Sequence, residues 1–288
     1  YWYLWQDRML FRDSNWNPHF PLAALDIAEI YHLGYGIQVD GIITSNNGLM
    51  LDILDLIDPI TVQGDRRTLN RERAKAYIEG LLPYPCSPHH ASIIGKHCFD
   101  EDLLMQLRNR LTDGISASQS EQLSQVLWTH LSKRNMFVQI FNPQEGNVWE
   151  KYGWSGAISP VNHDFLMAID SSVAGHPTVN VHRSLEYIIS LDRHESLQAQ
   201  LRLRYTHSGD PQQTICQQSE IPTSEHCYWN FLRVYIPKAA QDIQMPEFPL
   251  HAGSKKLIWG YRDADSASID SNIDFGDTTL SELSGLFV

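Results

Sequence analysis

Phe11-Arg12-Asp13-Ser14-Asn15-Trp16-Asn17-Pro18-His19-Phe20-Pro21 opens the part of the chain that decides its fold, and Val39-Asp40-Gly41-Ile42-Ile43 continues it. The first stretch sets an Arg-Asp pair among aromatic rings, where charge is costly to bury unless it is paired or hydrogen-bonded. Two prolines then fix the chain direction, and a helical pattern starts at once. We predict a buried, engaged Arg-Asp pair, a helix over 22–33 and a buried strand over 38–44.

Local patterns extend this prediction along the chain. Helices are expected over 49–57, 70–79 and 100–111, the second capped by Asn70, and a capping box of Ser118 and Glu121 should start another. Strands are expected over 60–62, 136–141, 165–169, 185–191, 197–205, 228–236 and 256–260, with a loop rich in Gly and Trp between 142 and 159. The strand over 228–236 should lie inside its sheet and end at Pro237.

This order of expected helices and strands predicts two domains. Residues 1–185 read as an α/β domain with a mixed sheet flanked by helices, and residues 186–288 as a β-rich, sandwich-like module cut short at its C-terminus. The chain starts at Tyr1 without a methionine, so we expect a fragment. It carries no signal peptide and no apolar run long enough to span a bilayer.

The hydrophobic content and the net charge of the chain exclude some classes of function. Hydrophobic residues make up 42% of the chain, enough for a real core, and the formal net charge is −12. Nucleic-acid binders present a basic face, and no Lys/Arg cluster of that kind is found, so we expect no nucleic-acid partner.

The four cysteines form two local pairs, Cys86 with Cys98 and Cys216 with Cys227. Neither pair has the tight spacing that zinc sites use. Two short-range disulfides in an oxidising compartment are one interpretation, and four free thiols in a cytosolic protein are the other.

Three blocks resemble a bacterial extracytoplasmic family known only as domain of unknown function 4012. They are residues 12–21, residues 39–62 and residues 228–237, with weaker matches at 153–156 and 204–207. The resemblance implies a membrane-anchored protein of the cell envelope whose N-terminal anchor precedes this chain.

Residues 39–62 and 69–77 are also distantly similar to the LytR–CpsA–Psr phosphotransferases, which move glycopolymers from a polyprenyl-pyrophosphate carrier to the cell wall. That likeness implies a LytR–CpsA–Psr-like first domain, with Arg12 and Asp13 near a pyrophosphate. The chain departs from it after Tyr77, where the arginines are missing and Asp100, Glu101 and Asp102 follow. Pyrophosphate binding needs several fixed positive donors, so this scaffold looks degenerate.

Arg12, Asp13 and Asp40 are the charged residues with the best claim to a catalytic site. They would handle an anion, with a carboxylate that places a metal or orients the arginine. Alternatively, they form a structural ion pair that holds the Trp16 loop on the core.

The sequence motifs that could indicate a metal site are incomplete. Asp270, Asn272 and Asp274 have the spacing of the start of a calcium loop, but they lack its Gly at position six and its closing Glu. His89, His90 and His97 have no ligand motif around them. We therefore expect no cofactor, and Mg or Mn only if the phosphotransferase chemistry survives.

The leading hypothesis is a non-catalytic extracytoplasmic protein of the cell envelope that acts in surface assembly or binding. Its partners would be other envelope or surface proteins, or a cell-surface glycopolymer. One alternative is an active glycopolymer transferase that uses polyprenyl-pyrophosphate-linked substrates, favoured by a pocket with three or more arginines. A second alternative is a carbohydrate-binding module, which needs an exposed aromatic platform built from some of the eight tryptophans.

Overall fold

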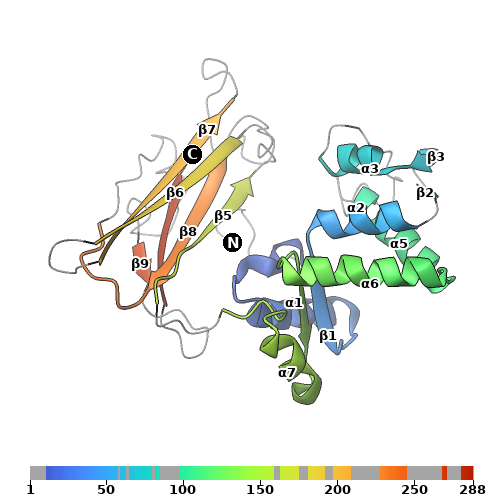
Figure 1. The fold of residues 1–288 in the computed structure, drawn as a ribbon, viewed down its shortest axis with the longest axis horizontal. Coiled ribbons are helices and arrows are strands. Elements are labelled where there is room, and N and C mark those ends of the chain that lie inside the picture. Colours follow the sequence, from blue (N-terminus) through green and yellow to red (C-terminus); the bar gives the residue numbers. More distant parts are fainter. Residues whose placement is uncertain are drawn as a thin grey trace. The chain divides into compact units, whose positions relative to one another are not determined.

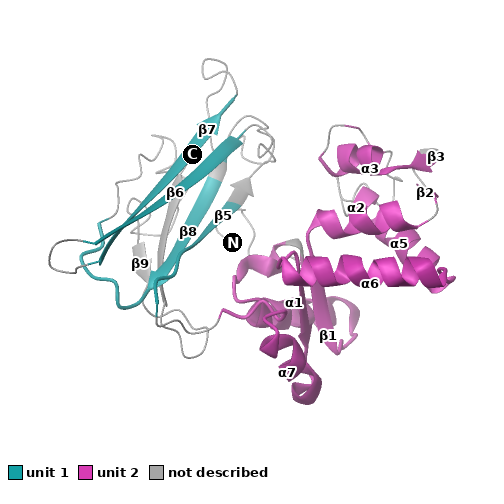
Figure 2. Ribbon diagram, in the orientation of Figure 1, with its two compact units in different colours: residues 1–9, 159–288 teal, residues 10–158 magenta. Residues whose placement is uncertain are grey.

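The computed structural model describes residues 11–57, 59–62, 65–79, 82, 84, 98–158, 163–174, 181–191, 197–208, 228–244, 268–270 and 280–287. The chain divides into two compact units (Figure 2): residues 10–158, here the helical unit, and residues 1–9 with 159–288, here the strand unit. Helices and strands are mixed, as the sequence predicts. The division after residue 158 differs from the expected boundary after residue 185, which falls inside strand β6 (Val181–Leu191).

The helical unit alternates helices with short strands (Figure 1). In chain order its elements are η2 (Phe11–Trp16), α1 (Phe20–Tyr35), β1 (Gly41–Ser45), α2 (Asn47–Leu56), β2 (Ile60–Val62), β3 (Asp65–Leu69), α3 (Arg71–Ile78), α5 (Cys98–Thr112), α6 (Ala117–Ser132), β4 (Met136–Ile140) and α7 (Pro143–Lys151). Strand β1 pairs with β4, and β2 pairs with β3. Both ladders are antiparallel, so the expected mixed sheet is replaced among the described strands by two small sheets.

The signature segment fixes the start of α1. The Ser14 hydroxyl donates to the Phe11 carbonyl at 2.6 Å, and Asn17 accepts from the backbone N–H of His19 at 2.9 Å. His19 in turn accepts, through Nδ1, from the N–H of Ile158 at 3.0 Å. Burial lowers the pKa of His19, and nearby Glu150 partly opposes that shift. The segment therefore ties α1 to the chain that leaves α7.

Two glycines of the family-like blocks are required by close packing. A Cβ on Gly41 would lie 2.4 Å from the Gln139 carbonyl oxygen of the neighbouring strand β4. Gly156 has φ +67°, and its Cβ would meet Phe20 and Phe137 at 2.8 Å. Side chains at either position would push β1 off β4 or α1 off the core.

The N-terminal caps predicted for two helices, α3 and α6, can be compared with the structure. Asn70 caps α3 as predicted, because its side chain accepts from the N–H of Arg73. The predicted capping box at Ser118 is wrong: Ser116 and Gln119 form it, with mutual hydrogen bonds of 3.2 and 3.0 Å. Helix α6 begins two residues earlier than expected, which leaves Ser118 inside its first turn.

The largest described core of the helical unit joins α2, α3, α5 and β2. Rings of Tyr77, Tyr84 and Phe99 pack with centroids 4.8 to 5.2 Å apart. Asp102, one of the three acids that follow where the phosphotransferases have arginines, is buried and accepts from the Tyr84 hydroxyl at 2.5 Å. The other buried members of this core are Leu51, Leu54, Ile57, Ile60, Val62, Leu69, Ala74, Leu103 and Leu107.

The strand unit contains β5 (Met167–Ala174), β6 (Val181–Leu191), β7 (Leu197–His207), β8 (Trp229–Pro237), β9 (Ser268–Asp270) and β10 (Leu280–Phe287). One sheet has the order β5-β8-β10-β9, and β6 and β7 form a long antiparallel pair (Figure 1). The internal position of β8 and its end at Pro237 are confirmed. The strand expected over 256–260 lies outside the described residues.

Cys98 is buried at the start of α5, and the described part of the chain contains no free cysteine. Cys86, Cys216 and Cys227 lie outside the described residues. The pairs Cys86–Cys98 and Cys216–Cys227 therefore stay predictions.

Candidate functional site

The charged trio expected at a catalytic site is only partly described. The side chain of Arg12 and its pairing with Asp13 lie outside the described part of the chain, while Asp13 is half-buried in η2. Asp40 is exposed, and its backbone carbonyl accepts from the N–H of Phe141 at 2.8 Å. The described contact of Asp40 thus belongs to the backbone of the β1–β4 region.

The metal candidates give no described site. Only the backbone of Asp270 is described, at the end of β9. Asn272, Asp274, His89, His90 and His97 lie outside the described residues. Among the residues that the structure describes, no group of three His, Cys, Asp or Glu side chains could hold a metal ion.

Four aromatic side chains gather at the end of α7, and we call them the Trp154 cluster: Trp128, Trp149, Tyr152 and Trp154. Tyr152 stacks on Trp154 with ring centroids 4.9 Å apart. Trp128, from α6, meets the same indole edge-on at 5.2 Å, and Trp149 lies 5.9 Å away. Trp154 is thus the centre on which residues from two helices converge.

The end of α7 builds this cluster through local geometry. Gly153 takes φ +70°, the left-handed conformation that ends helices, and its N–H bonds the Glu150 carbonyl at 2.8 Å. The chain then turns back, so that the N–H of Trp154 donates to the Trp149 carbonyl at 2.8 Å. The Trp154 carbonyl accepts from Val138 of β4, which anchors the turn to the sheet.

Two members of the cluster face outward. Trp128 and Tyr152 are each 59% exposed, while Trp149 and Trp154 are half-buried against the core that includes Val138. Rigid rings with apolar faces and polar edges, held by packing behind them, suit stacking against a flat, partly apolar ligand.

Sequence reasoning missed both the cluster and α7, because residues 142–159 read as a loop. The sequence nevertheless contains the residues that typically begin and end a short helix. Asn142 caps the helix by accepting from the N–H of Gln144, Pro143 occupies its first position, and Gly153 follows its end. That order of cap, proline and glycine is typical of a short helix.

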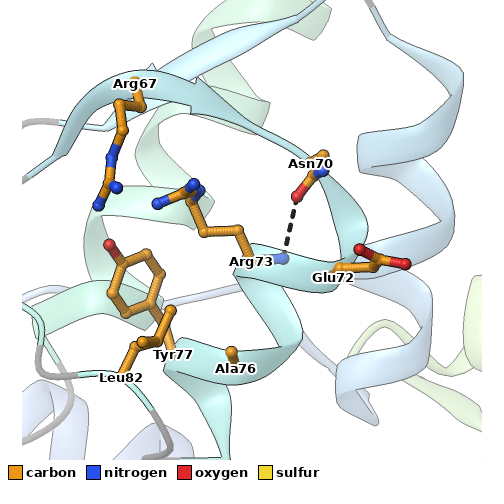
Figure 3. Close-up of a pocket in the computed structure, with 7 residues that line it drawn as sticks. All are labelled: Arg67, Asn70, Glu72, Arg73, Ala76, Tyr77 and Leu82. Atoms are coloured by element: carbon orange, nitrogen blue, oxygen red, sulfur yellow. Dashed lines mark hydrogen bonds between the residues drawn. The ribbon is translucent and has the colours of Figure 1, made fainter.

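A second site lies at the start of α3, where a surface hollow of about 540 Å³ is lined by Arg67, Asn70, Glu72, Arg73, Ala76, Tyr77 and Leu82. In Figure 3 the guanidinium groups of Arg67 and Arg73 and the hydroxyl of Tyr77 point toward one another. The Glu72 carboxylate lies on the other side of the helix start. We call this site the Arg67–Arg73 hollow.

A charged network links α2, α3 and α6, and its Arg71 is the first residue of α3. Asp52 bonds His130 Nε2 at 2.8 Å and Arg71 at 2.8 Å, and Arg71 also reaches Asp55 at 2.6 Å. Burial by itself would raise the pKa of Asp52, but the hydrogen bonds from His130 and Arg71 outweigh it and lower that pKa. These bonds also raise the pKa of Arg71.

The Asp52–His130 pair does not form a catalytic triad in the described structure. His130 is 5% exposed, and its Nδ1 is buried with no hydrogen-bond partner among the described residues. A triad needs a nucleophile hydrogen-bonded to the second ring nitrogen. The network therefore serves to hold three helices together.

Residues 2–80 match the family described as protein of unknown function (DUF4012). The family predicted from the sequence is thereby confirmed over those residues. No curated protein and no solved structure matches the chain. In the described part of the chain, no helix combines the length and the hydropathy needed to cross a membrane.

Proposed function

We propose that this protein is a non-catalytic, extracytoplasmic component of the bacterial cell envelope that binds a surface glycopolymer at the Trp154 cluster. The observation that carries the proposal is the exposure of Trp128 and Tyr152, which both pack on Trp154. The family resemblance supports an envelope location and a membrane-anchored full-length protein. Binding without catalysis is proposed because the arginines of the phosphotransferases are missing after Tyr77, where Asp100, Glu101 and Asp102 follow.

Sugar rings fit such a surface because one face of a pyranose presents C–H groups, while its edge presents hydroxyls. An indole or phenol ring buries the apolar face at little entropic cost, since its own position is already fixed. Glu150 and Lys151, which are exposed and lie between Trp149 and Tyr152 in the chain, offer polar groups for the hydroxyls.

The test is binding of the intact chain to a panel of bacterial envelope polysaccharides by affinity electrophoresis, followed by titration calorimetry on any polysaccharide that retards it. Trp128→Ala and Tyr152→Ala should each weaken binding about tenfold or more, as is typical of aromatic anchors. Tyr35→Ala is the matched control, because Tyr35 is also an exposed tyrosine and lies outside the cluster.

Retardation that survives both cluster substitutions, or that Tyr35→Ala abolishes equally, would contradict the proposal. Thermal unfolding of each variant separates lost binding from lost folding. Because both rings are largely exposed, we expect little change in the unfolding temperature.

The alternative function is glycopolymer transfer from a polyprenyl-pyrophosphate carrier; a pocket with three or more arginines would favour it, and the described lining of the Arg67–Arg73 hollow has two. We also propose that the helical unit is a degenerate LytR–CpsA–Psr-like scaffold and that the strand unit is a sandwich-like module. Their support is the sequence resemblance of residues 39–62 and 69–77. A transfer assay with magnesium or manganese should give no product, and activity lost on Arg12→Ala would promote this alternative.

A further inference from the structure

We propose that one face of the β6–β7 pair is a docking surface for a second copy of this chain. The register of the two strands places apolar residues opposite one another on this face. We call the eight residues of these four pairs the ribbon face: Leu185 with Leu203, Tyr187 with Leu201, Ile189 with Ala199 and Leu191 with Leu197.

The other side of the same two strands is mostly polar. Successive residues of a strand point to opposite faces, so the pairs between those of the ribbon face lie on the reverse side. These pairs are Ser184 with Arg204, Glu186 with Arg202, Ile188 with Gln200 and Ser190 with Gln198. An antiparallel sheet with this alternation normally buries its apolar side against another layer.

The ribbon face continues a surface that is already covered at one end. Arg183 and Tyr205 are the next pair on the same side, and both bond Asp170 of β5. Asp170 lies opposite Leu232 in the β5–β8 ladder, so Leu232 shares its side of that sheet, where it is buried. At this end, therefore, β5 and β8 supply the layer that the β6–β7 pair packs on (Figure 1).

Beyond that end, the ribbon face is largely uncovered. Leu185 and Ile189 are each 52% exposed, Leu191 is 65% exposed and Leu197 is 58% exposed. Large apolar side chains that gather on one face and stay accessible mark an interaction surface, because their burial is the main driving force for association. An occupant of this surface would extend the layer that β5 and β8 begin.

The charge of the ribbon face indicates which occupant fits it. None of its eight residues is charged, so neither an acidic nor a basic partner gains an ion pair there. A second copy presents an identical apolar face, and a two-fold axis brings the two faces together without opposing like charges. An anionic bilayer fits less well, because elements that lie on such surfaces carry an excess of Lys and Arg, whereas this chain has a formal net charge of −12.

The size of the ribbon face predicts a weak dimer. Burying a fully exposed Leu or Ile side chain removes on the order of 100 Å² of apolar surface from water. At the exposures observed, the ribbon face supplies roughly 300 Å² per copy, against about 800 Å² per partner in a standard interface. We therefore expect a reversible dimer with a dissociation constant above about 1 μM.

The experiment is sedimentation velocity of the intact chain at concentrations from about 1 to 200 μM, a range that spans such a constant. The average sedimentation coefficient should rise with concentration from that of a monomer toward that of a dimer. Added sodium chloride should strengthen the dimer, because it screens the repulsion between two chains of net charge −12 and leaves an apolar contact intact.

Three substitutions test the ribbon face. Leu191→Lys should raise the dissociation constant about tenfold or more, because the two-fold contact then brings two like charges into one apolar interface. Ile188→Lys is the matched control, since Ile188 is exposed on the same strand but lies on the reverse side, and it should leave the constant unchanged. Mixing Leu191→Lys with Leu191→Glu should restore association, because two copies of the same face then carry opposite charges.

A sedimentation coefficient that stays constant over the whole range would overturn the proposal, and so would equal weakening by Ile188→Lys. A large fall in the unfolding temperature of monomeric Leu191→Lys would also overturn it, by showing that the face is covered within one chain. Phosphatidylcholine vesicles that bind the natural chain but not Leu191→Lys would assign the face to lipid instead. Trp128→Ala should leave self-association unchanged, which keeps this test independent of the polysaccharide test.

Discussion

Two aspartates organise polar networks in the two units, and their surroundings differ. Asp170, on β5, accepts from Arg183 of β6 at 3.1 Å, Tyr205 of β7 at 2.5 Å and Asn230 of β8 at 2.6 Å. Asp52, on α2, bonds His130 and Arg71 in the helical unit. The side chain of Asp170 is 19% exposed, whereas that of Asp52 is 37% exposed.

The Asp170 network joins two sheets. Arg183 and Tyr205 lie directly opposite each other on the β6–β7 pair, and both reach the carboxylate on β5. Burial and then the bond to Asp170 raise the pKa of Tyr205 well above its usual range, and the same carboxylate raises the pKa of Arg183. This single carboxylate therefore links four strands, including the fully buried Asn230 of β8.

The difference in exposure between Asp170 and Asp52 indicates which carboxylate contributes more to the stability of the fold. A carboxylate with three donors and little water is hard to replace, because each donor would lose its acceptor. A carboxylate nearer the surface shares its donors with water and can be lost more cheaply. Four predictions test this contrast, from the largest effect to the smallest.

Asp170→Ala should lower the free energy of unfolding by about 3 kcal/mol, because buried Asn230 and half-buried Tyr205 lose their acceptor. Urea unfolding of the intact chain measures the loss, and amide exchange locates it on β6 and β7. A loss below about 1 kcal/mol would mean that water replaces the carboxylate and that the contrast with Asp52 fails.

His130→Ala should cost about 2 kcal/mol, because it removes the bond to Asp52 and leaves a gap between α2 and α6. The same urea experiment measures it. His130→Gln serves as the companion variant, since its amide can still donate to Asp52. If the glutamine variant is no more stable than the alanine variant, the hydrogen bond contributes nothing.

The pH dependence of stability should carry the signature of Asp52. Its pKa is lowered in the folded state, so its stabilising contribution is complete above the unfolded value of about 3.9 and is lost as the pH falls through the folded value. The stability difference between the natural chain and Asp52→Asn, about 1 kcal/mol at pH 6, should shrink steadily below pH 4. A difference that stays constant down to pH 2 would contradict the ion-pair interpretation.

Arg202→Gln should change stability by less than about 0.5 kcal/mol. Arg202 pairs with Glu186 across β6 and β7 at 2.6 Å, but both side chains are more than half exposed. This variant is the baseline for the Asp170 measurement, because it breaks an ion pair on the same strands without touching the buried network. A loss near that of Asp170→Ala would show that the β6–β7 pair is sensitive to any charge change.

The sequence by itself determined the features that depend on neighbouring residues. Helix α3 starts where Asn70 can cap it, and β8 ends where Pro237 cannot donate to a ladder. The family resemblance over residues 2–80 also follows from the order of residues alone. The one local error of this kind, the capping box at Ser118, arose because Ser116 with Gln119 offers the same chemistry two residues earlier.

Only the tertiary structure decided which residues come together. The donors to Asp170 lie 13, 35 and 60 residues away in the chain, and Trp128 meets Trp154 from a different helix. The direction of Arg73 toward Arg67 depends on how β3 turns into α3. Such contacts follow from packing between elements rather than from spacing along the chain, so no periodicity or cap in the sequence encodes them.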